Sequence, residues 1–308
     1  MPTAFVFPGQ GSHRAGALSS WTGHPAARIL DQIADGLGRD IVAISEDEDA
    51  GSRTADAQPA IMAASLVAWQ ALVDAGVRAD LVAGHSLGEY TATVAAGAMD
   101  VRTGARLVGV RGEAMGKACA ANPGTMAAVV KLSPDAVAVL VDGIDGLVVA
   151  NDNAPGQVVV AGTPEAVAAV RSRARDAGGR ALPLDVEGAF HSPAMAPAVD
   201  ALSAALEEHP PSDPQVPIVS GATAREIERA EPLADALVAG ILSPVRWREV
   251  QLRLAELGVE DLVEIGPGGV LSGLAKRTLP GVRVHAIATP DDLDAVVTAL
   301  GSPAGVRH

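Results

Sequence analysis

Residues 84–88 read Gly-His-Ser-Leu-Gly, and these residue types at this spacing could place a reactive serine. In the pattern G-x-S-x-G, small residues flank a serine on a sharp turn between a strand and a helix, so that its hydroxyl is exposed. An apolar run at 80–84 and an alanine-rich helical pattern after the motif supply this context. The helix N-terminus also favours a developing oxyanion. We therefore predict that Ser86 is a nucleophile; a structural turn serine is the alternative.

A nucleophilic serine needs a base, and His191 is the best candidate among the seven histidines. It follows the last strand of a small predicted unit, where the chain returns to a larger one; the alternative is a loop histidine without a role. His85 adjoins Ser86 on a strand, so its side chain points to the opposite face. His13, in the first glycine-rich loop, cannot be dismissed in the same way. No aspartate between serine and histidine follows a strand of the larger unit, so we expect a main-chain carbonyl to orient the imidazole.

One arginine lies on an apolar helix stripe. In the predicted helix 102–119, Arg111 shares its stripe with Leu107, Val108 and Met115. Burying an unpaired guanidinium is expensive, so Arg111 needs either an internal acid or a ligand carboxylate. A structural ion pair and a ligand-binding role are both open on these grounds.

The order of predicted strands and helices indicates two units that could position these side chains. Residues 125–185 predict strand, helix, strand, strand, helix, strand, which is the ferredoxin-like βαββαβ order. Strands and helices alternate before and after this segment, which is typical of an α/β fold. We predict an α/β-hydrolase-like domain with a parallel sheet (1–124 and 189–308), an inserted ferredoxin-like subdomain (125–188) and a ligand cleft between them. The predicted strands of the larger domain are 3–7, 80–84, 216–220, 261–265 and 283–288, and the predicted surface loops are 45–56 and 208–215.

Composition narrows the classes of partner. Aromatic residues make up only 2% of the chain and the net charge is −14, so we expect neither a nucleic acid nor a membrane as partner. A single cysteine, Cys119, excludes a disulfide framework and a cysteine-rich zinc site, and no metal is expected. The chain opens without a signal-peptide pattern and has no apolar run near the roughly 20 residues of a membrane helix. These features predict a cytoplasmic protein.

Eight short blocks follow one another along nearly the whole chain. They are Phe7-Pro-Gly-Gln-Gly-Ser12, Gln58-Pro59, Gly84-His-Ser-Leu-Gly-Glu-Tyr90, Arg111-Gly112, Ala150-Asn-Asp-Asn-Ala-Pro-Gly-Gln-Val158, Gly188-Ala-Phe-His-Ser192, Pro244-Val-Arg-Trp247 and Glu264-Ile-Gly-Pro-Gly268. Together they resemble the malonyl-CoA:acyl carrier protein transacylases, most closely the free-standing acyltransferases that serve polyketide synthases. The first loop departs from the family, because His13 stands where glutamine is usual.

The resemblance implies a reaction and a set of partners. A malonyl group would pass from malonyl-CoA to the phosphopantetheine thiol of an acyl carrier protein, by a ping-pong route through an acyl-serine intermediate. The pathway would be polyketide or fatty acid biosynthesis, and no cofactor would be bound permanently. The alternative is a serine thioesterase or esterase that passes the acyl group to water. Arg111 argues against that alternative, because a generic esterase has no reason to aim a cation into its pocket.

The resemblance also implies roles for residues. Ser86 would be the acylated nucleophile, with His191 as general base and acid. N–H groups of Gln10 and Leu87 would form the oxyanion hole. Substrate would be bound by Arg111, which would hold the malonyl carboxylate, by Gln58 in the pocket lining and by Phe190 against the malonyl α-carbon, while the carbonyl of Arg246 would orient His191.

Carrier proteins are typically acidic, so an acidic enzyme needs a local cationic patch to bind one. Two pairs are candidates. Arg171 and Arg175 share one helix face, and Lys276 and Arg277 adjoin each other near the C-terminus. A solvated surface is the alternative for each of these residues.

Overall fold

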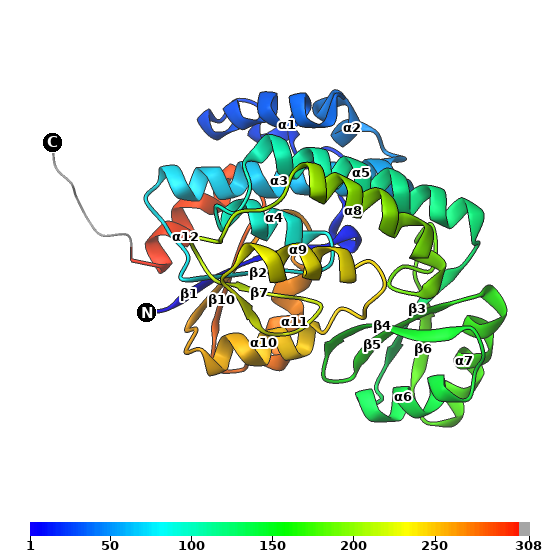
Figure 1. Ribbon diagram of the computed structural model, residues 1–308. Helices are drawn as coiled ribbons and strands as arrows, with labels where there is room; N and C mark the ends of the chain where they lie inside the picture. Colours follow the sequence, from blue (N-terminus) through cyan, green and yellow to red (C-terminus); the bar gives the residue numbers. More distant parts are fainter. Residues whose placement is uncertain (302–308) are drawn as a thin grey trace, which may run out of the picture.

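The computed structural model describes residues 1–301, and a six-stranded sheet lies at the centre of its larger part (Figure 1). All its strand pairs are parallel except the last, which is antiparallel. In spatial order the strands are β10 (Arg283–Ile287), β9 (Asp261–Ile265), β1 (Thr3–Phe7), β2 (Leu81–Gly84), β7 (Ile218–Val219) and β8 (Glu226–Ile227). The five predicted strands are present, although β7 is shorter than expected, and β8 was not predicted.

Helices cover both faces of this sheet. Phe5 and Phe7 of β1 pack towards the longest helices, whereas Ala4 and Val6 pack towards the opposite layer. This alternation follows from the period of two residues along a strand. The first layer contains α3 (Thr54–Asp74), α4 (Gly88–Ala95), α5 (Val101–Ala121), α8 (Val199–Glu208), α9 (Ala230–Ala239) and α12 (Leu293–Ala299), with α1 (Leu30–Leu37) and α2 (Ile41–Glu46) outside it. The second layer contains α10 (Trp247–Glu256) and α11 (Val270–Thr278).

The inserted segment forms a four-stranded antiparallel sheet with two helices on one face. Its strand order β4-β5-β3-β6 is the ferredoxin-like arrangement, as predicted. The other face is turned towards the larger part of the chain, because Met126 and Ala128 join the main core while Ala127 and Val129 pack under the helices. The elements are β3 (Thr125–Val130), α6 (Pro134–Asp142), β4 (Leu147–Ala154), β5 (Gln157–Gly162), α7 (Pro164–Asp176) and β6 (Arg180–Pro183). The domain limits of 1–124, 125–188 and 189–308 stay predictions.

Edge strand β4 is bound to the segment that leads into α10. The Asp152 N–H donates to the Val245 carbonyl at 2.9 Å, and the Val245 N–H donates to the Ala150 carbonyl at 2.8 Å. The Asp152 carboxylate also accepts from the Arg248 guanidinium at 2.7 Å. These bonds fix the small sheet against the larger part of the chain and set the width of the cleft between them.

The two loop predictions had different outcomes. Residues after α8 are irregular up to β7, as expected for 208–215. The prediction for 45–56 was wrong at both ends, since α2 continues to Glu46 and α3 begins at Thr54. Asp56 is buried there and accepts from Arg39 and Arg53 at 2.5 Å each, so paired charges allow an apparently polar stretch to begin a buried helix.

Candidate active site

Ser86 lies on a sharp turn between β2 and α4. Its φ is 54°, a left-handed conformation that costs energy for a residue with a side chain. The turn requires glycine on both sides, because a Cβ at Gly84 would lie 2.0 Å from the Gly88 carbonyl carbon. A Cβ at Gly88 would lie 2.0 Å from the Phe7 carbonyl oxygen. The chemistry of the motif therefore follows from backbone contacts that no larger residue permits.

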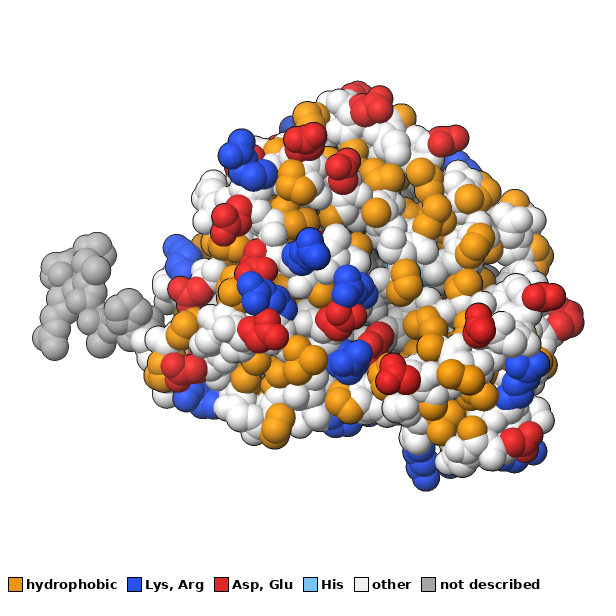
Figure 2. Space-filling model, turned by 60° about the horizontal axis from the view of Figure 1, so that its bottom comes forward, with side chains coloured by type: hydrophobic (Ala, Val, Ile, Leu, Met, Phe, Trp, Pro, Cys, Tyr) orange, Lys and Arg blue, Asp and Glu red, His pale blue; other side chains and the backbone are white. Residues whose placement is uncertain are grey.

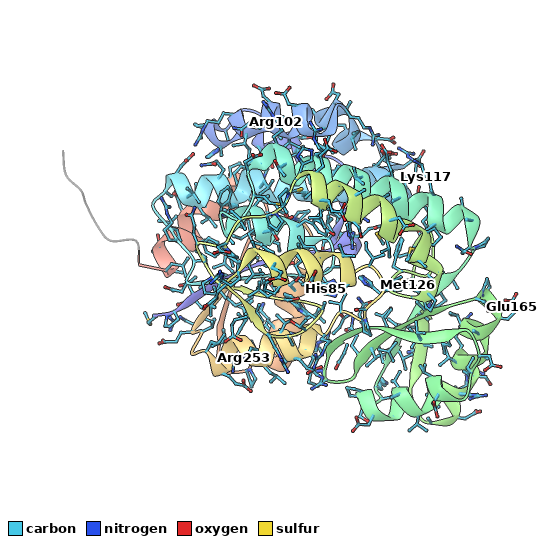
Figure 3. The ribbon with its side chains drawn as sticks, in the orientation of Figure 1. His85, Arg102, Lys117, Met126, Glu165 and Arg253 are labelled. Atoms are coloured by element: carbon cyan, nitrogen blue, oxygen red, sulfur yellow. The ribbon has the colours of Figure 1, made fainter. Side chains whose placement is uncertain are left out.

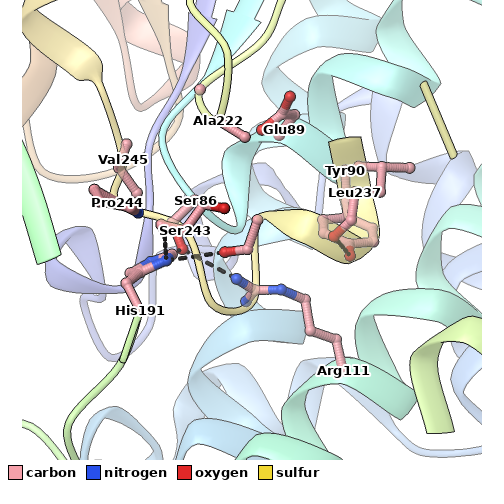
Figure 4. A pocket seen from close by; sticks show the side chains of 12 residues that line it. Ser86, Glu89, Tyr90, Arg111, His191, Ala222, Leu237, Ser243, Pro244 and Val245 are labelled. Carbon is pink, nitrogen blue, oxygen red and sulfur yellow. Dashed lines mark hydrogen bonds between the residues drawn. The ribbon is translucent and has the colours of Figure 1, made fainter. Parts of the chain in front are cut away.

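His191 faces the serine across the cleft (Figure 4). Its Nε2 lies 2.8 Å from Ser86 Oγ, and its φ of 57° is also left-handed. Burial, with the charge of Arg111 as a smaller cause, lowers the pKa of His191 to about 3. The unliganded imidazole is therefore neutral near pH 7, which is the state in which Nε2 can accept the serine proton.

Two main-chain carbonyls hold the other nitrogen of the imidazole. Nδ1 lies 2.9 Å from the Gly240 carbonyl oxygen and 3.1 Å from that of Ser243. A main-chain acceptor was expected, but the choice of Arg246 was wrong. The Arg246 carbonyl accepts the Val250 N–H at 2.9 Å in the first turn of α10, so it is engaged in the helix.

Arg111 reaches the same site from α5. One terminal nitrogen donates to Ser86 Oγ at 3.0 Å and the other to Gln58 Oε1 at 2.6 Å. The side chain is only 3% exposed, its Nε has no partner, and no carboxylate within residues 1–301 forms an ion pair with it. Burial raises the pKa of nearby Glu89 to about 7, which makes that acid a weak counter-charge. A buried, unpaired guanidinium beside a serine hydroxyl is suited to an anionic ligand.

A chain of hydrogen bonds continues from Gln58. Its Nε2 donates to Gln10 Oε1 at 3.5 Å, and Gln10 Nε2 donates to Thr54 Oγ1 at 3.1 Å. The Thr54 N–H donates to Glu187 Oε2 at 2.7 Å, although Glu187 is 133 residues away in sequence. The carboxylate caps the N-terminus of α3, where a negative charge is favourable. Glu187, which sequence reasoning missed, thus anchors the segment that carries His191.

The N–H groups of Gln10 and Leu87 are free to bind an oxyanion. Neither donates a hydrogen bond to a backbone or side-chain acceptor within the described chain. Gln10 begins a short turn of helix (Gln10–Ser12), and Leu87 immediately precedes α4. The first loop lies directly against the serine turn, because a Cβ at Gly9 would lie 2.6 Å from the His85 carbonyl oxygen.

A cavity of about 270 Å³ opens between the two parts of the chain and reaches the dyad. Phe190 lies in its wall, as do Ser86, His191, Arg111 and Gln58. The opposite wall includes Met126 of β3, and Figure 3 shows it on the side of the small sheet. Amide side chains from the strands β4 and β5 also line the cavity: Asn151, Asn153 and Gln157.

Neither His13 nor His85 forms a hydrogen bond with Ser86, although His85 lines the same cavity as the dyad. His13 packs beside Gly51, whose Cβ would lie 2.8 Å from the ring, so it is not brought to the serine. His85 lies half-buried next to the serine turn, with Nε2 2.8 Å from Asn153 Oδ1 and its ring edge-on to Trp247. Figure 3 places it in the larger part of the chain.

The two predicted cationic pairs lie in different places. Arg171 and Arg175 are exposed on α7, on the face of the small sheet opposite the cavity. Lys276 and Arg277 are exposed in the last turn of α11, and Arg277 donates to Gln157 Oε1 at 2.5 Å at the cavity wall. Figure 2 shows acidic and basic side chains interspersed over one face of the molecule rather than gathered by sign.

The structure of residues 1–301 shows neither a membrane-spanning helix nor a metal-binding cluster. No helix in this range is long and apolar enough to cross a membrane. Within the same range, no group of three or more His, Cys, Asp and Glu side chains is placed to hold a metal ion.

A serine on a glycine-flanked turn, facing a histidine in the cleft of an α/β fold, defines the class of enzymes that pass acyl groups through a serine. Residues 4–291 match the model of the acyl transferase domain family. The chain belongs to this family. It is 35% identical over 306 residues to the malonyl CoA-acyl carrier protein transacylase of Bacillus subtilis, with 96% of each chain covered. The transacylase of Escherichia coli K12 is 36% identical over 303 residues, with 96% of this chain and 98% of the relative covered.

Solved structures agree with these relatives. The malonyl-CoA:ACP transacylase of Synechocystis sp. PCC 6803 superposes with a TM-score of 0.89 at 36% identity, covering 96% of this chain and 100% of that one. A malonyl-transacylase solved in complex with a type II polyketide synthase acyl carrier protein gives a TM-score of 0.92, also at 36% identity. That match covers 97% of this chain and 100% of the other. The fold expected from the sequence is therefore confirmed.

Proposed function

We propose that the protein moves a malonyl group from malonyl-CoA to the phosphopantetheine thiol of an acyl carrier protein. The observation that carries this proposal is Arg111, a buried cation without an acidic partner among residues 1–301, bonded to the hydroxyl of Ser86. A malonyl thioester has a carboxylate at one end and the reactive carbonyl two carbons away. The guanidinium can hold the first while the serine attacks the second. The names of the relatives support the same donor and acceptor.

In the first half-reaction, His191 Nε2 takes the proton of Ser86 Oγ as the oxygen attacks the thioester carbonyl. The N–H groups of Gln10 and Leu87 would stabilise the oxyanion of the tetrahedral intermediate. The C–S bond then breaks, and the imidazolium returns its proton to the departing CoA sulfur. The second half-reaction runs these steps in reverse, with the carrier thiol as nucleophile and the serine oxygen as leaving group.

The carbonyls of Gly240 and Ser243 do the work that an aspartate does in a triad. They accept the Nδ1–H of His191, so that Nε2 stays free to accept a proton from the serine. A thiolate is a much better leaving group than an amine anion, because a thiol is far more acidic than an amine N–H; the pKa of an unperturbed cysteine thiol is about 8.5. A weaker orienting acceptor is therefore sufficient for exchange between thioesters and an ester.

Phe190 would set the size of the acyl group. It lines the cavity and immediately precedes the base, where its ring would crowd a branch at the malonyl α-carbon. Excluding one extra methyl group in this way is worth about 1–3 kcal/mol. We therefore propose malonyl rather than methylmalonyl as the acyl group.

The direct test is intact-mass spectrometry of the enzyme after mixing with malonyl-CoA. We expect the mass of one malonyl ester, discharged by holo carrier protein and absent from the Ser86→Ala variant. Steady release of free malonate without a carrier would instead indicate a hydrolase. Absence of any adduct would contradict the proposed function.

The Arg111→Ala variant should distinguish recognition of the malonyl carboxylate from acyl transfer itself. The variant loses the partner of the malonyl carboxylate but keeps the acyl-transfer groups, so malonyl transfer should fall by at least about a hundredfold while acetyl transfer persists or rises. Rates with malonyl-CoA and acetyl-CoA measure this directly. A variant that still prefers malonyl would show that another residue recognises the carboxylate.

Lys276 and Arg277 are the better placed of the two cationic pairs to meet a carrier, because α11 borders the cavity. Reversing both charges to Glu should raise the KM for carrier protein about tenfold at low salt, and less at high salt. The same reversal at Arg171 and Arg175 is the matched control and should have a smaller effect. An equal or larger effect of the α7 pair would move the docking face to the small sheet.

As part of the same proposal, the enzyme works in the cytoplasm, in polyketide or fatty acid biosynthesis, without a resident cofactor.

A further inference from the structure

Tyr90, the single tyrosine of the chain, lies in α4 four residues after Ser86 and is 2% exposed. Arg111 lies over its ring, with the guanidinium carbon 5.4 Å from the ring centre. Figure 4 shows the two side chains together beside α9. At this distance the face of an aromatic ring attracts a cation. The ring is therefore a contact of Arg111 in addition to its hydrogen bonds with Ser86 and Gln58.

The ring contact differs from these hydrogen bonds in what it leaves free. Each terminal nitrogen of Arg111 donates to a neutral oxygen, and a malonyl carboxylate would have to take over these donors. The ring attracts the guanidinium through its quadrupole, which requires none of the terminal N–H groups. An acidic side chain in the same place would form a permanent ion pair and compete with the substrate. The ring of Tyr90 can therefore hold the guanidinium both before and after a carboxylate binds.

The hydroxyl of Tyr90 makes a separate contact, with the end of α9. It donates to the Leu237 carbonyl at 3.0 Å. This carbonyl needs a partner from outside the helix, because the N–H of Ile241 donates at 3.1 Å to the carbonyl one residue further on. Gly240 follows in the same turn, and its carbonyl oxygen lies 2.9 Å from His191 Nδ1. The hydroxyl thus fixes the last turn of the helix that orients the base.

We infer that Tyr90 is a positioning residue with two separable contacts: its ring holds Arg111 in place for the malonyl carboxylate, and its hydroxyl holds the end of α9 in place for His191. The ring then affects the choice between malonyl and acetyl donors, which differ only in that carboxylate. The hydroxyl affects both donors alike, because both need the base. The inference rests on the proposed function, since it takes the carboxylate from the proposed donor.

The test measures acylation of the full-length enzyme by malonyl-CoA and by acetyl-CoA, with kcat/KM for each donor from intact-mass spectrometry. Tyr90→Phe keeps the ring but leaves the Leu237 carbonyl without its partner. Both values of kcat/KM should fall about two- to fivefold, and their ratio should not change. Tyr90→Leu also loses the ring, so the malonyl value and the ratio of malonyl to acetyl should fall a further three- to tenfold. If Tyr90→Leu does not fold, Tyr90→Met gives the same comparison, because its flexible side chain fills the space without a ring face.

Two further comparisons separate this role from general stability. In an Arg111→Ala background, Tyr90→Leu and Tyr90→Phe should give the same ratio, because the ring no longer has a cation to hold. Thr93→Val is the matched control. Thr93 is buried in the same helix, does not line the cavity, and donates its hydroxyl to the Glu89 carbonyl at 2.8 Å. This control should keep both rates.

Several outcomes would overturn the inference. A ratio that falls as far in Tyr90→Phe as in Tyr90→Leu would assign the selectivity to the hydroxyl. Equal losses with both donors in Tyr90→Leu would leave the ring with a packing role only. Unchanged rates in Tyr90→Phe would remove the hydroxyl from the support of His191. Failure of the proposed function would look different, because the wild-type enzyme would then take up no malonyl group at all.

Discussion

The two members of the dyad share one hydrogen bond but are placed by different kinds of contact. Ser86 is positioned mainly by its own neighbours in sequence, since Gly84 and Gly88 press against each other and against β1. His191 is positioned by groups 49 and 52 residues away, the carbonyls of Gly240 and Ser243, and its segment is anchored through Glu187. The serine side is therefore a local motif, whereas the histidine side exists only once the tertiary structure has formed.

Both residues adopt left-handed backbone conformations. Different contacts stabilise these two conformations, so substitutions should disrupt them in different ways. A strained residue of this kind costs on the order of 1–3 kcal/mol and persists because its surroundings leave no alternative. At the serine those surroundings are backbone atoms in van der Waals contact. At the histidine they are hydrogen bonds, which can be removed singly. We therefore expect abrupt failure on the serine side and graded failure on the histidine side.

The largest effect should come from Gly88→Ala. The new Cβ would lie 2.0 Å from the Phe7 carbonyl oxygen, so β1 and the serine turn must separate. Acylation of Ser86 should fall by more than about a hundredfold, since a misplacement of 1 Å can cost that much. Melting temperature and acylation rate measure the two consequences.

Gly273→Ala is the matched control for that variant. Gly273 lies in α11 with no atom within 4 Å of its added Cβ, and alanine is the better helix former. It should keep full activity and gain a little stability. If Gly88→Ala behaved like Gly273→Ala, the serine turn would not depend on local packing and the contrast between the two sides would fail.

An effect of intermediate size is expected on the pH at which protonation of His191 stops acylation. Its pKa of about 3 is set first by burial and then by the charge of Arg111. Acylation should therefore stay flat from pH 8 down to about pH 5, because the base remains unprotonated. In Arg111→Ala the repulsion between charges is lost, so the pKa rises and the acidic limb moves to higher pH. Profiles measured with acetyl-CoA keep the substrate the same for both enzymes.

The same pKa has a consequence for stability, with a definite sign. In the unfolded chain His191 returns to its ordinary value near 6.5, so the unfolded state binds more protons than the folded one between about pH 6.5 and pH 3. The neutral, buried His191 therefore contributes fully to the free energy of unfolding above about pH 6.5, and this contribution is lost as the pH falls from about 6.5 to about 3. A His191→Gln variant should lose less stability than the wild type between pH 7 and pH 5. Parallel losses would mean that the imidazole is not buried as described.

The contrast also explains what could be predicted from the sequence. The role of Ser86 could be predicted because the five adjacent residues 84–88 determine the geometry of its turn. The ferredoxin-like order could be predicted because it depends on local strand and helix patterns. The carbonyls that accept from Nδ1 of His191 could not be predicted in this way. Arg246 is ruled out as the acceptor only by the exact residue at which α10 begins, because its carbonyl is then bonded within the helix. The contact between His85 and Asn153 spans 68 residues and has no local signal. Pairwise long-range geometry is the part that a single sequence does not contain.

The smallest effect should come from Glu187, the distant anchor of the histidine side. Its carboxylate accepts the Thr54 N–H at 2.7 Å, and Thr54 in turn accepts from Gln10, whose backbone N–H is a proposed oxyanion donor. Removing a cap of this kind costs about 0.5–2 kcal/mol. Glu187→Ala should therefore lower kcat for acylation a few-fold, with little change in the KM for the donor, because an oxyanion donor acts mainly in the transition state.

Two comparisons decide whether Glu187 acts through this chain of bonds. Glu187→Gln keeps an acceptor oxygen and should retain most of kcat, whereas Asp185→Ala removes an exposed acid of the same segment and should change nothing. In a Gln10→Ala background, which keeps the backbone N–H but cuts the side-chain tether, Glu187→Ala should cause no further loss. Additive losses would place the effect of Glu187 in the general stability of the segment. The histidine side would then depend on its carbonyls alone, and the contrast with the serine side would rest on a single pair of hydrogen bonds.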